Sequence, residues 1–144
     1  TPHIVHWVGL DSEVTDEQHA AHPDLQMYPI AATAVVPIYH LPNATSSDPP
    51  LVLSRGVLAD VFRSVITRWD DERIAAENPA LVALGRLPAA DILVVVQSDN
   101  SSTTETFRRA LTAFDMDGFG RQVGVSPGPE WGNSSVYRCN SASF

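Results

Sequence analysis

Residues 94–111, "VVVQSDNSSTTETFRRAL", constrain the fold of this chain more than any other stretch. A run of β-branched residues passes into a polar loop, and apolar residues at helical spacing follow. The apolar run "DILVVVQ" predicts a strand buried on both faces, as in a parallel sheet, with residues 92–96 as a central strand. Residues 103–114 are predicted to form a helix with Phe107, Leu111 and Phe114 on one face. A strand, a short loop and a helix in this order indicate an α/β protein.

The loop between the two elements concentrates polar side chains where a strand passes into a helix. These are Ser98, Asp99, Asn100, Ser101, Ser102, Thr103 and Thr104. The first turn of a helix carries free N–H groups and a partial positive charge, so it can bind an anion without lysine or arginine. Capping explains the same residues, because Ser102 and Glu105 fit the capping-box pattern. The sequence leaves both interpretations open.

The carboxylate of Asp99 would determine which anion the loop prefers. A carboxylate repels a fully deprotonated oxyanion such as sulfate, but it can accept the proton that hydrogen phosphate carries. A buried acceptor left without a partner costs a few kcal/mol, which is enough to discriminate strongly between two ligands.

The rest of the chain alternates predicted strands and helices. Strands are expected over residues 3–10 and 27–41, and the polar stretch between them opens a short helix or turn that Pro23 stops. A helix is predicted from an apolar stripe, closed by Trp69 and made of Val57, Leu58, Val61, Phe62, Val65 and Ile66. Asp70 is the predicted N-cap of a further short helix that ends before Pro79. From Asp115 onward we expect little regular structure.

The composition allows one domain and excludes some partners. With 144 residues and 44% hydrophobic side chains, a single domain over residues 1–144 can bury roughly 70% of the unfolded chain's surface. The net charge is −8, and all nine bases are arginine. An acidic surface argues against nucleic acid as a partner, and no apolar run is long enough to insert in a membrane.

Several other residues are candidates for a modification or metal site. The lone Cys139 forms no internal disulfide, and the glycosylation pattern occurs at Asn43, Asn100 and Asn133. His3 and His6, like His19 and His22, have the spacing of helical metal ligands but lack a third ligand, so we expect no metal and no other cofactor.

No nucleophile elbow or phosphate loop of the P-loop type is present, so we expect no catalytic residue and no enzyme. Trp131, in a Gly-rich segment, is the predicted exposed contact. Arg108 and Arg109 are expected on a solvated helix face, with Glu105 as a partner.

Three segments in order resemble the phosphate-binding proteins of bacterial ABC transporters, which have the type II periplasmic-binding-protein fold. "GLDSEVTDEQ" and the strand after it, "LADVFRSVITRWDDERIAAENPAL", and "VVVQSDNSSTTETF" match the family's order and spacing from about residue 4 to residue 114. The resemblance implies a periplasmic-binding-protein-like lobe, with a small, mostly parallel sheet flanked by helices. It covers only the middle portion of the family, so a second lobe, another chain or a larger receptor would complete a site.

The resemblance also assigns residues to the site. Asp11 matches an aspartate in the family's earlier turn, Asp99 matches the loop aspartate, and Ser101 and Thr103 match hydroxyl residues that donate to phosphate. Gln97 stands where the family usually has arginine, and Asn100 and Ser102 replace glycines, so the loop is expected to be reshaped.

We therefore expect an extracellular or periplasmic solute-binding or sensing module that binds phosphate or a similar small oxyanion. The predicted ligand-binding residues are Asp11, Ser98, Asp99, Ser101, Ser102, Thr103 and Thr104. The alternative is a surface module for adhesion or assembly on the same scaffold, with the anion site lost.

Overall fold

The computed structural model describes residues 6–132 and 136–139, the last four by their backbone alone. The chain divides into two compact units, residues 1–34 and 35–144. In chain order the elements are α1 (Asp16–Ala21), α2 (Arg55–Phe62), α3 (Glu72–Glu77), α4 (Pro79–Ala83), β1 (Val94–Gln97), α5 (Ser102–Phe114), the π-helix η1 (Met116–Gly120) and β2 (Val136–Cys139). The single domain over residues 1–144 stays a prediction.

The described part of the first unit, residues 6–34, contains one regular element, the short helix α1. Thr15 caps it in a capping box: its hydroxyl oxygen accepts from the N–H of Gln18 at 3.2 Å, and its own N–H donates to Oε1 of Gln18 at 2.9 Å. The helix ends at Ala21, before Pro23, as predicted.

The two strands predicted in the first 41 residues are wrong where the structure describes them. Residues 6–10 and 27–41 form neither helix nor strand. Ile30 and Ile38, in the longer of these stretches, are 93% and 88% exposed. An apolar, β-branched sequence becomes a strand only when a neighbouring strand pairs with its N–H and C=O groups, and no described residue pairs with these stretches in a sheet.

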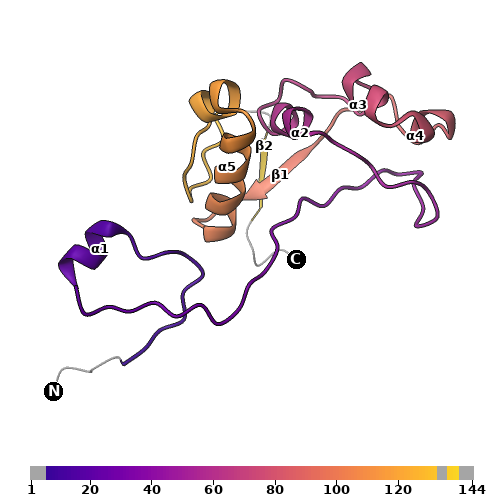
Figure 1. The fold of residues 1–144 in the computed structure, drawn as a ribbon. Coiled ribbons are helices and arrows are strands. Elements are labelled where there is room, and N and C mark those ends of the chain that lie inside the picture. Colours follow the sequence, from indigo (N-terminus) through magenta and orange to yellow (C-terminus); the bar gives the residue numbers. More distant parts are fainter. Residues whose placement is uncertain (1–5, 133–135, 140–144) are drawn as a thin grey trace. The chain divides into compact units, whose positions relative to one another are not determined.

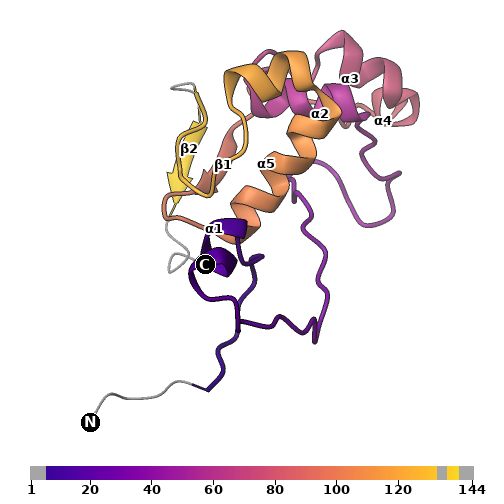
Figure 2. The ribbon, with the colours of Figure 1, turned by 60° about the vertical axis from the view of Figure 1, so that its left-hand side comes forward.

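The second unit contains a parallel strand pair beside the long helix α5 (Figures 1 and 2). In the register of the pair, Val94 lies opposite Val136 and Gln97 opposite Cys139. Val94 and Val96 are buried, whereas Val95 is 49% exposed, so burial alternates along β1 and the prediction of two buried faces is wrong. Within the described residues β1 pairs on one side only, so it is not the predicted central strand. The wider parallel sheet stays a prediction.

Helix α2 packs on α5 through aromatic side chains, and the core gathers around this contact. The rings of Phe62 and Phe107 meet edge to face, 4.8 Å apart. The core consists of Val57, Ala59, Val61, Ile66, Ile74, Val94, Val96, Leu111, Phe119 and Trp131. Helix α2 ends at Phe62, so the predicted apolar stripe runs past the helix: Ile66 is buried, but Val65 is 47% exposed.

The segment that follows the predicted apolar stripe begins its short helix one residue later than predicted. Trp69 is half-buried. Helix α3 is capped by Asp71, whose carboxylate accepts from the N–H of Arg73. Asp70, the predicted cap, instead pairs with Arg68 at 2.8 Å.

The prediction of little structure from Asp115 onward is wrong. The π-helix η1 follows α5 directly, and β2 supplies the second strand. Trp131, predicted as an exposed contact, is 2% exposed. It packs against the rings of Phe62 and Phe119 at 5.6 and 6.1 Å, so this glycine-rich segment closes the core.

Candidate functional site

The loop from β1 to α5 places the predicted site at the start of a 13-residue helix. Ser101 is the N-cap, with extended backbone angles of −147° and 131°, and its Oγ accepts from the N–H of Thr104 at 3.5 Å. The predicted cap, Ser102, is instead the first helical residue. Glu105, predicted to reach back to the cap, pairs with Arg109 at 2.9 Å. The capping box is therefore absent, although the helix begins within one residue of its predicted start.

Two backbone donors at this helix start have no acceptor in the part of the chain that the structure describes. They are the N–H groups of Ser102 and Thr103. The N–H of Ser101, by contrast, donates to the carbonyl of Pro127 at 3.0 Å. The side chain of Thr103 is exposed and that of Ser102 is half-buried. The first turn of α5 thus combines two available N–H groups with hydroxyl side chains, which is a suitable environment for an anion.

The predicted site residue Thr104 points into the protein. Its side chain is 6% exposed, and its hydroxyl donates to Oε1 of Gln97 at 3.3 Å. This bond ties the end of β1 to the first turn of α5. For Thr104 to donate to a ligand, the bond to Gln97 would have to be replaced.

The other predicted site residues lie in different places. Asp99 is exposed and Ser98 half-buried in the loop itself, each with an interaction inside the protein. Asp11 is exposed in the first unit. The structure therefore brings together the loop residues, whereas Asp11 belongs to the other unit.

Arg108 is a central residue of this region that sequence reasoning misassigned. It is 2% exposed rather than solvated, and burial lowers the pKa of its guanidinium. The guanidinium donates to the backbone carbonyls of Val123, Gly124, Gly128 and Glu130 at 2.6 to 3.1 Å. It also lies 5.4 Å from the centre of the Trp131 ring. The sequence does contain a signal for the burial of Arg108. This residue lies four positions after Thr104 and three before Leu111, so all three share the buried face of α5. Arg109 is exposed and pairs with Glu105, as predicted.

A second helix start, that of η1, is filled by the chain's own carboxylate. The two oxygens of Asp115 accept from the N–H groups of Gly118 and Phe119, each at 2.9 Å. These backbone hydrogen bonds, with a smaller contribution from the charge of Arg63, hold the pKa of the Asp115 carboxyl below its usual value. A side chain at Gly118 would collide with Arg63 and Asp115, so glycine is required where the chain closes on this site.

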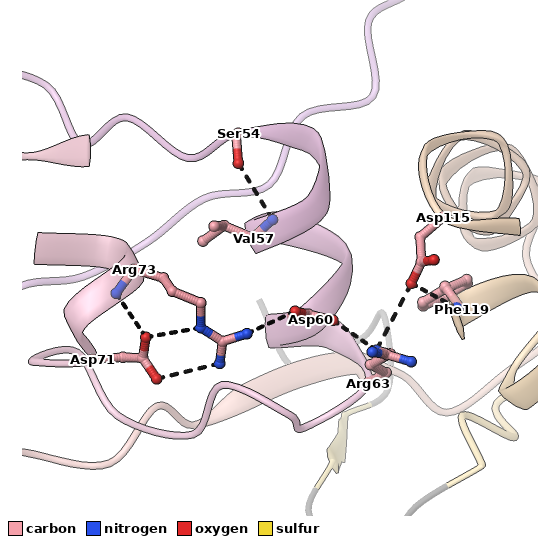
Figure 3. A network of polar contacts seen from close by, with 8 residues as sticks. All are labelled: Ser54, Val57, Asp60, Arg63, Asp71, Arg73, Asp115 and Phe119. Carbon is pink, nitrogen blue, oxygen red and sulfur yellow. Dashed lines mark hydrogen bonds and ion pairs between the residues drawn. The ribbon is translucent and has the colours of Figure 1, made fainter. Parts of the chain in front are cut away.

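Charged side chains continue from this second helix start across α2 to α3 (Figure 3). Arg63 lies between Asp115 at 3.8 Å and Asp60 at 2.7 Å. Arg73 joins Asp60 at 2.9 Å to Asp71 at 3.1 Å. These acids and bases bind one another, which makes the network a structural link between helices.

The predicted glycosylation, thiol and metal-binding residues lie partly outside the described residues. Asn43 and Asn100 are exposed, while Asn133 and His3 lie outside the described residues, as does the side chain of Cys139. Glycosylation and the state of the thiol stay predictions. Among the described residues, no group of three His, Cys, Asp or Glu side chains is arranged to hold a metal ion, and no helix has the length and apolar character to cross a membrane.

Comparison with known proteins identifies the family. Residues 4–138 match the family described as "PBP superfamily domain". The chain belongs to this PBP superfamily. The PBP-like fold is thereby confirmed, although only two paired strands are described.

Several similar proteins are phosphate-binding proteins. It is 37% identical over 111 residues to the phosphate-binding protein PstS of Methanocaldococcus jannaschii, and the match covers 77% of this chain and 27% of that protein. The phosphate-binding protein PstS of Xylella fastidiosa is 30% identical over 123 residues, covering 85% of this chain and 32% of that protein. The resemblance to phosphate-binding proteins is therefore confirmed for a partial domain, since the chain spans about a third or less of these relatives.

A different kind of protein contains a similar stretch. The putative serine/threonine-protein kinase/receptor R831 of Acanthamoeba polyphaga mimivirus is 33% identical over 115 residues, which is 78% of this chain and 7% of that protein. A PBP-like stretch of this kind thus also occurs within a much longer protein.

Proposed function

We propose that this PBP-like chain is a solute-binding or sensing module that binds phosphate or a similar small oxyanion at the start of α5. The observation that carries the proposal is the pair of N–H groups on Ser102 and Thr103, which have no acceptor among the described residues. The matching proteins named as phosphate-binding support it, because this loop lies inside the matched region. The site consists of these two groups, the hydroxyls of the 98–104 loop, and Asp99.

The side chains that the structure describes supply no cation to the proposed site. Gln97 occupies the position at which phosphate-binding proteins usually have arginine, and its Oε1 is already bonded to Thr104. The two arginines of α5 are committed elsewhere, Arg108 to backbone carbonyls and Arg109 to Glu105. Binding therefore depends on backbone N–H groups and the helix dipole, each worth on the order of 1 kcal/mol. We expect millimolar rather than micromolar affinity from the isolated chain.

Asp99 is the proposed source of selectivity. It accepts the proton of a protonated oxyanion and repels one that has no proton, so phosphate binds in preference to sulfate. Asp11 and a second lobe, another chain or a larger receptor would complete the site in the whole protein, since the chain spans about a third or less of the relatives. An extracellular or periplasmic position and a non-enzymatic role belong to the same proposal.

The second candidate is a surface module for adhesion or assembly in which the anion site has been lost. The bond between Thr104 and Gln97 favours it, because it occupies one predicted ligand hydroxyl. The exposed apolar residues Val36 and Ile38 of the second unit also suit a contact surface.

Calorimetric titration with phosphate, sulfate and acetate at millimolar concentration tests the proposal. Wild type should bind phosphate more tightly than sulfate, and Asp99→Asn should lose that preference, because it removes the carboxylate and adds a donor. Asp117→Asn is the matched control, since it makes the same charge change at a residue whose side chain is 86% exposed. If wild type binds none of the three anions, the surface-module candidate takes its place.

A further inference from the structure

Arg108 binds one continuous segment that comes back against α5. The four carbonyls that accept from its guanidinium all lie within residues 123–130. Gly124 has a φ of +66°, a left-handed conformation that favours glycine. No carboxylate pairs with Arg108 among the described residues, so the carbonyl dipoles and the Trp131 ring stabilise its charge. A rigid guanidinium fork can hold several carbonyls in a fixed arrangement, whereas a flexible ammonium cannot.

The same segment also contacts the oxyanion loop. Pro127, between the carbonyls that Arg108 binds, accepts the N–H of Ser101 at 3.0 Å. At Gly128 an added Cβ would lie 3.6 Å from Oδ1 of Asn100, which is ordinary contact distance. Ser101 is the N-cap of α5. The position of the helix start is therefore fixed partly from outside the helix, by residues 123–130.

We propose that Arg108 is a positioning residue for the oxyanion site: it holds residues 123–130 in the shape that keeps Ser101, and with it the first turn of α5, in place. Its effect on binding rests on the proposed function, whereas the link from Arg108 to Ser101 rests on the hydrogen bonds alone. The guanidinium bonds only to backbone carbonyls among the described residues, so it acts on the ligand through the loop.

Hydrogen exchange of the Ser101 amide, measured on the 144-residue chain, tests the link itself. Arg108→Met should make this amide exchange on the order of tenfold faster, and Arg108→Lys should fall between Met and wild type. Arg109→Met is the matched control, because it removes the same charge from the neighbouring exposed position and should leave the amide unchanged. Equal rates in all four proteins overturn the proposal, as does an equal acceleration at the core amide of Leu111, which indicates general loosening. If Arg108→Met does not fold, Arg108→Lys decides the result.

Phosphate titration of the same variants tests the effect on the site. Arg108→Met should weaken phosphate binding about fivefold, the worth of one hydrogen bond, and Arg109→Met should not. Full affinity in Arg108→Lys would show that charge alone is sufficient, which contradicts a positioning role. If wild type fails to bind phosphate, the proposed function is wrong, and the exchange rates still decide whether Arg108 positions Ser101.

Discussion

Helix α5 and the π-helix η1 are capped differently within the described residues: a carboxylate caps η1, the filled start, whereas a single hydroxyl caps α5, the open start. At η1, the carboxylate of Asp115 accepts from two consecutive N–H groups, those of Gly118 and Phe119. At α5, Ser101 accepts from Thr104 alone. The N–H groups of Ser102 and Thr103 have no acceptor among the described residues, and neither do the first two N–H groups of η1. The filled start shows how this protein binds an internal anion, with two short backbone bonds and an arginine nearby.

An external anion at α5 could supply the acceptor that Asp115 supplies at η1. A phosphate or sulfate oxygen would accept from Ser102 and Thr103 as Asp115 accepts at η1. Among the described side chains, the two arginines of α5 are bound elsewhere, so neither supports this oxygen as Arg63 supports Asp115. We therefore expect the filled start to contribute strongly to stability and the open one to contribute chiefly to binding.

The largest expected effect comes from emptying the filled start. Asp115→Ala removes two backbone hydrogen bonds and a partner of Arg63, so the free energy of unfolding should fall by about 2 kcal/mol. Chemical denaturation measures the change. Asp117→Ala is the control, because its exposed pairing with Arg121 should contribute little. Equal losses in the two variants would remove the distinction between a filled and an open helix start.

The filled start should also make stability depend on pH. The pKa of Asp115 in the folded protein is lowered chiefly by the bonds from Gly118 and Phe119. A lowered folded pKa adds stability above the unfolded value of about 4, and this stability is lost as the pH falls through the folded value. Denaturation at pH 7 and at decreasing pH should show a decline in wild type that is shallower in Asp115→Asn. Some decline should persist, because the pKa values of Asp48, Asp70 and Asp71 are lowered too.

The smallest expected effect concerns a single hydroxyl at the open start. Thr103→Ala should weaken both phosphate and sulfate about fivefold, the worth of one hydrogen bond, and leave stability nearly unchanged because Thr103 is exposed. Thr106→Ala, at another exposed threonine of α5, is the matched control. Calorimetry on the two variants compares them directly. A loss in Thr106→Ala as large as in Thr103→Ala would mean that the hydroxyl at residue 103 does not contact the anion.

The sequence predicted the elements whose signals are local. The apolar spacing in residues 103–114 located α5 to within one residue, and the β-branched run located β1 to within two. The cap was assigned one residue late because Ser101 and Ser102 are chemically equal candidates, and only the backbone geometry distinguishes them.

Features that depend on distant partners could not be predicted in this way. Arg108 binds carbonyls 15 to 22 residues further along the chain. Every residue has a backbone carbonyl, so no sequence pattern indicates which ones an arginine will bind. Trp131 seemed exposed because glycine, proline and serine surround it, yet the rings that cover it come from α2 and η1. Residues 27–41 have the composition of a strand, but a strand also needs a neighbour.

A phosphate titration followed in the amide NMR spectrum of the wild-type chain shows whether the anion binds at the start of α5, because the amides of both helix starts are observed in one experiment. Phosphate should shift the Ser102 and Thr103 amides progressively and saturably, while the amides of Gly118 and Phe119, already bonded to Asp115, stay in place. Unchanged Ser102 and Thr103 amides, or shifts of equal size at both helix starts, would contradict an oxyanion site at the start of α5.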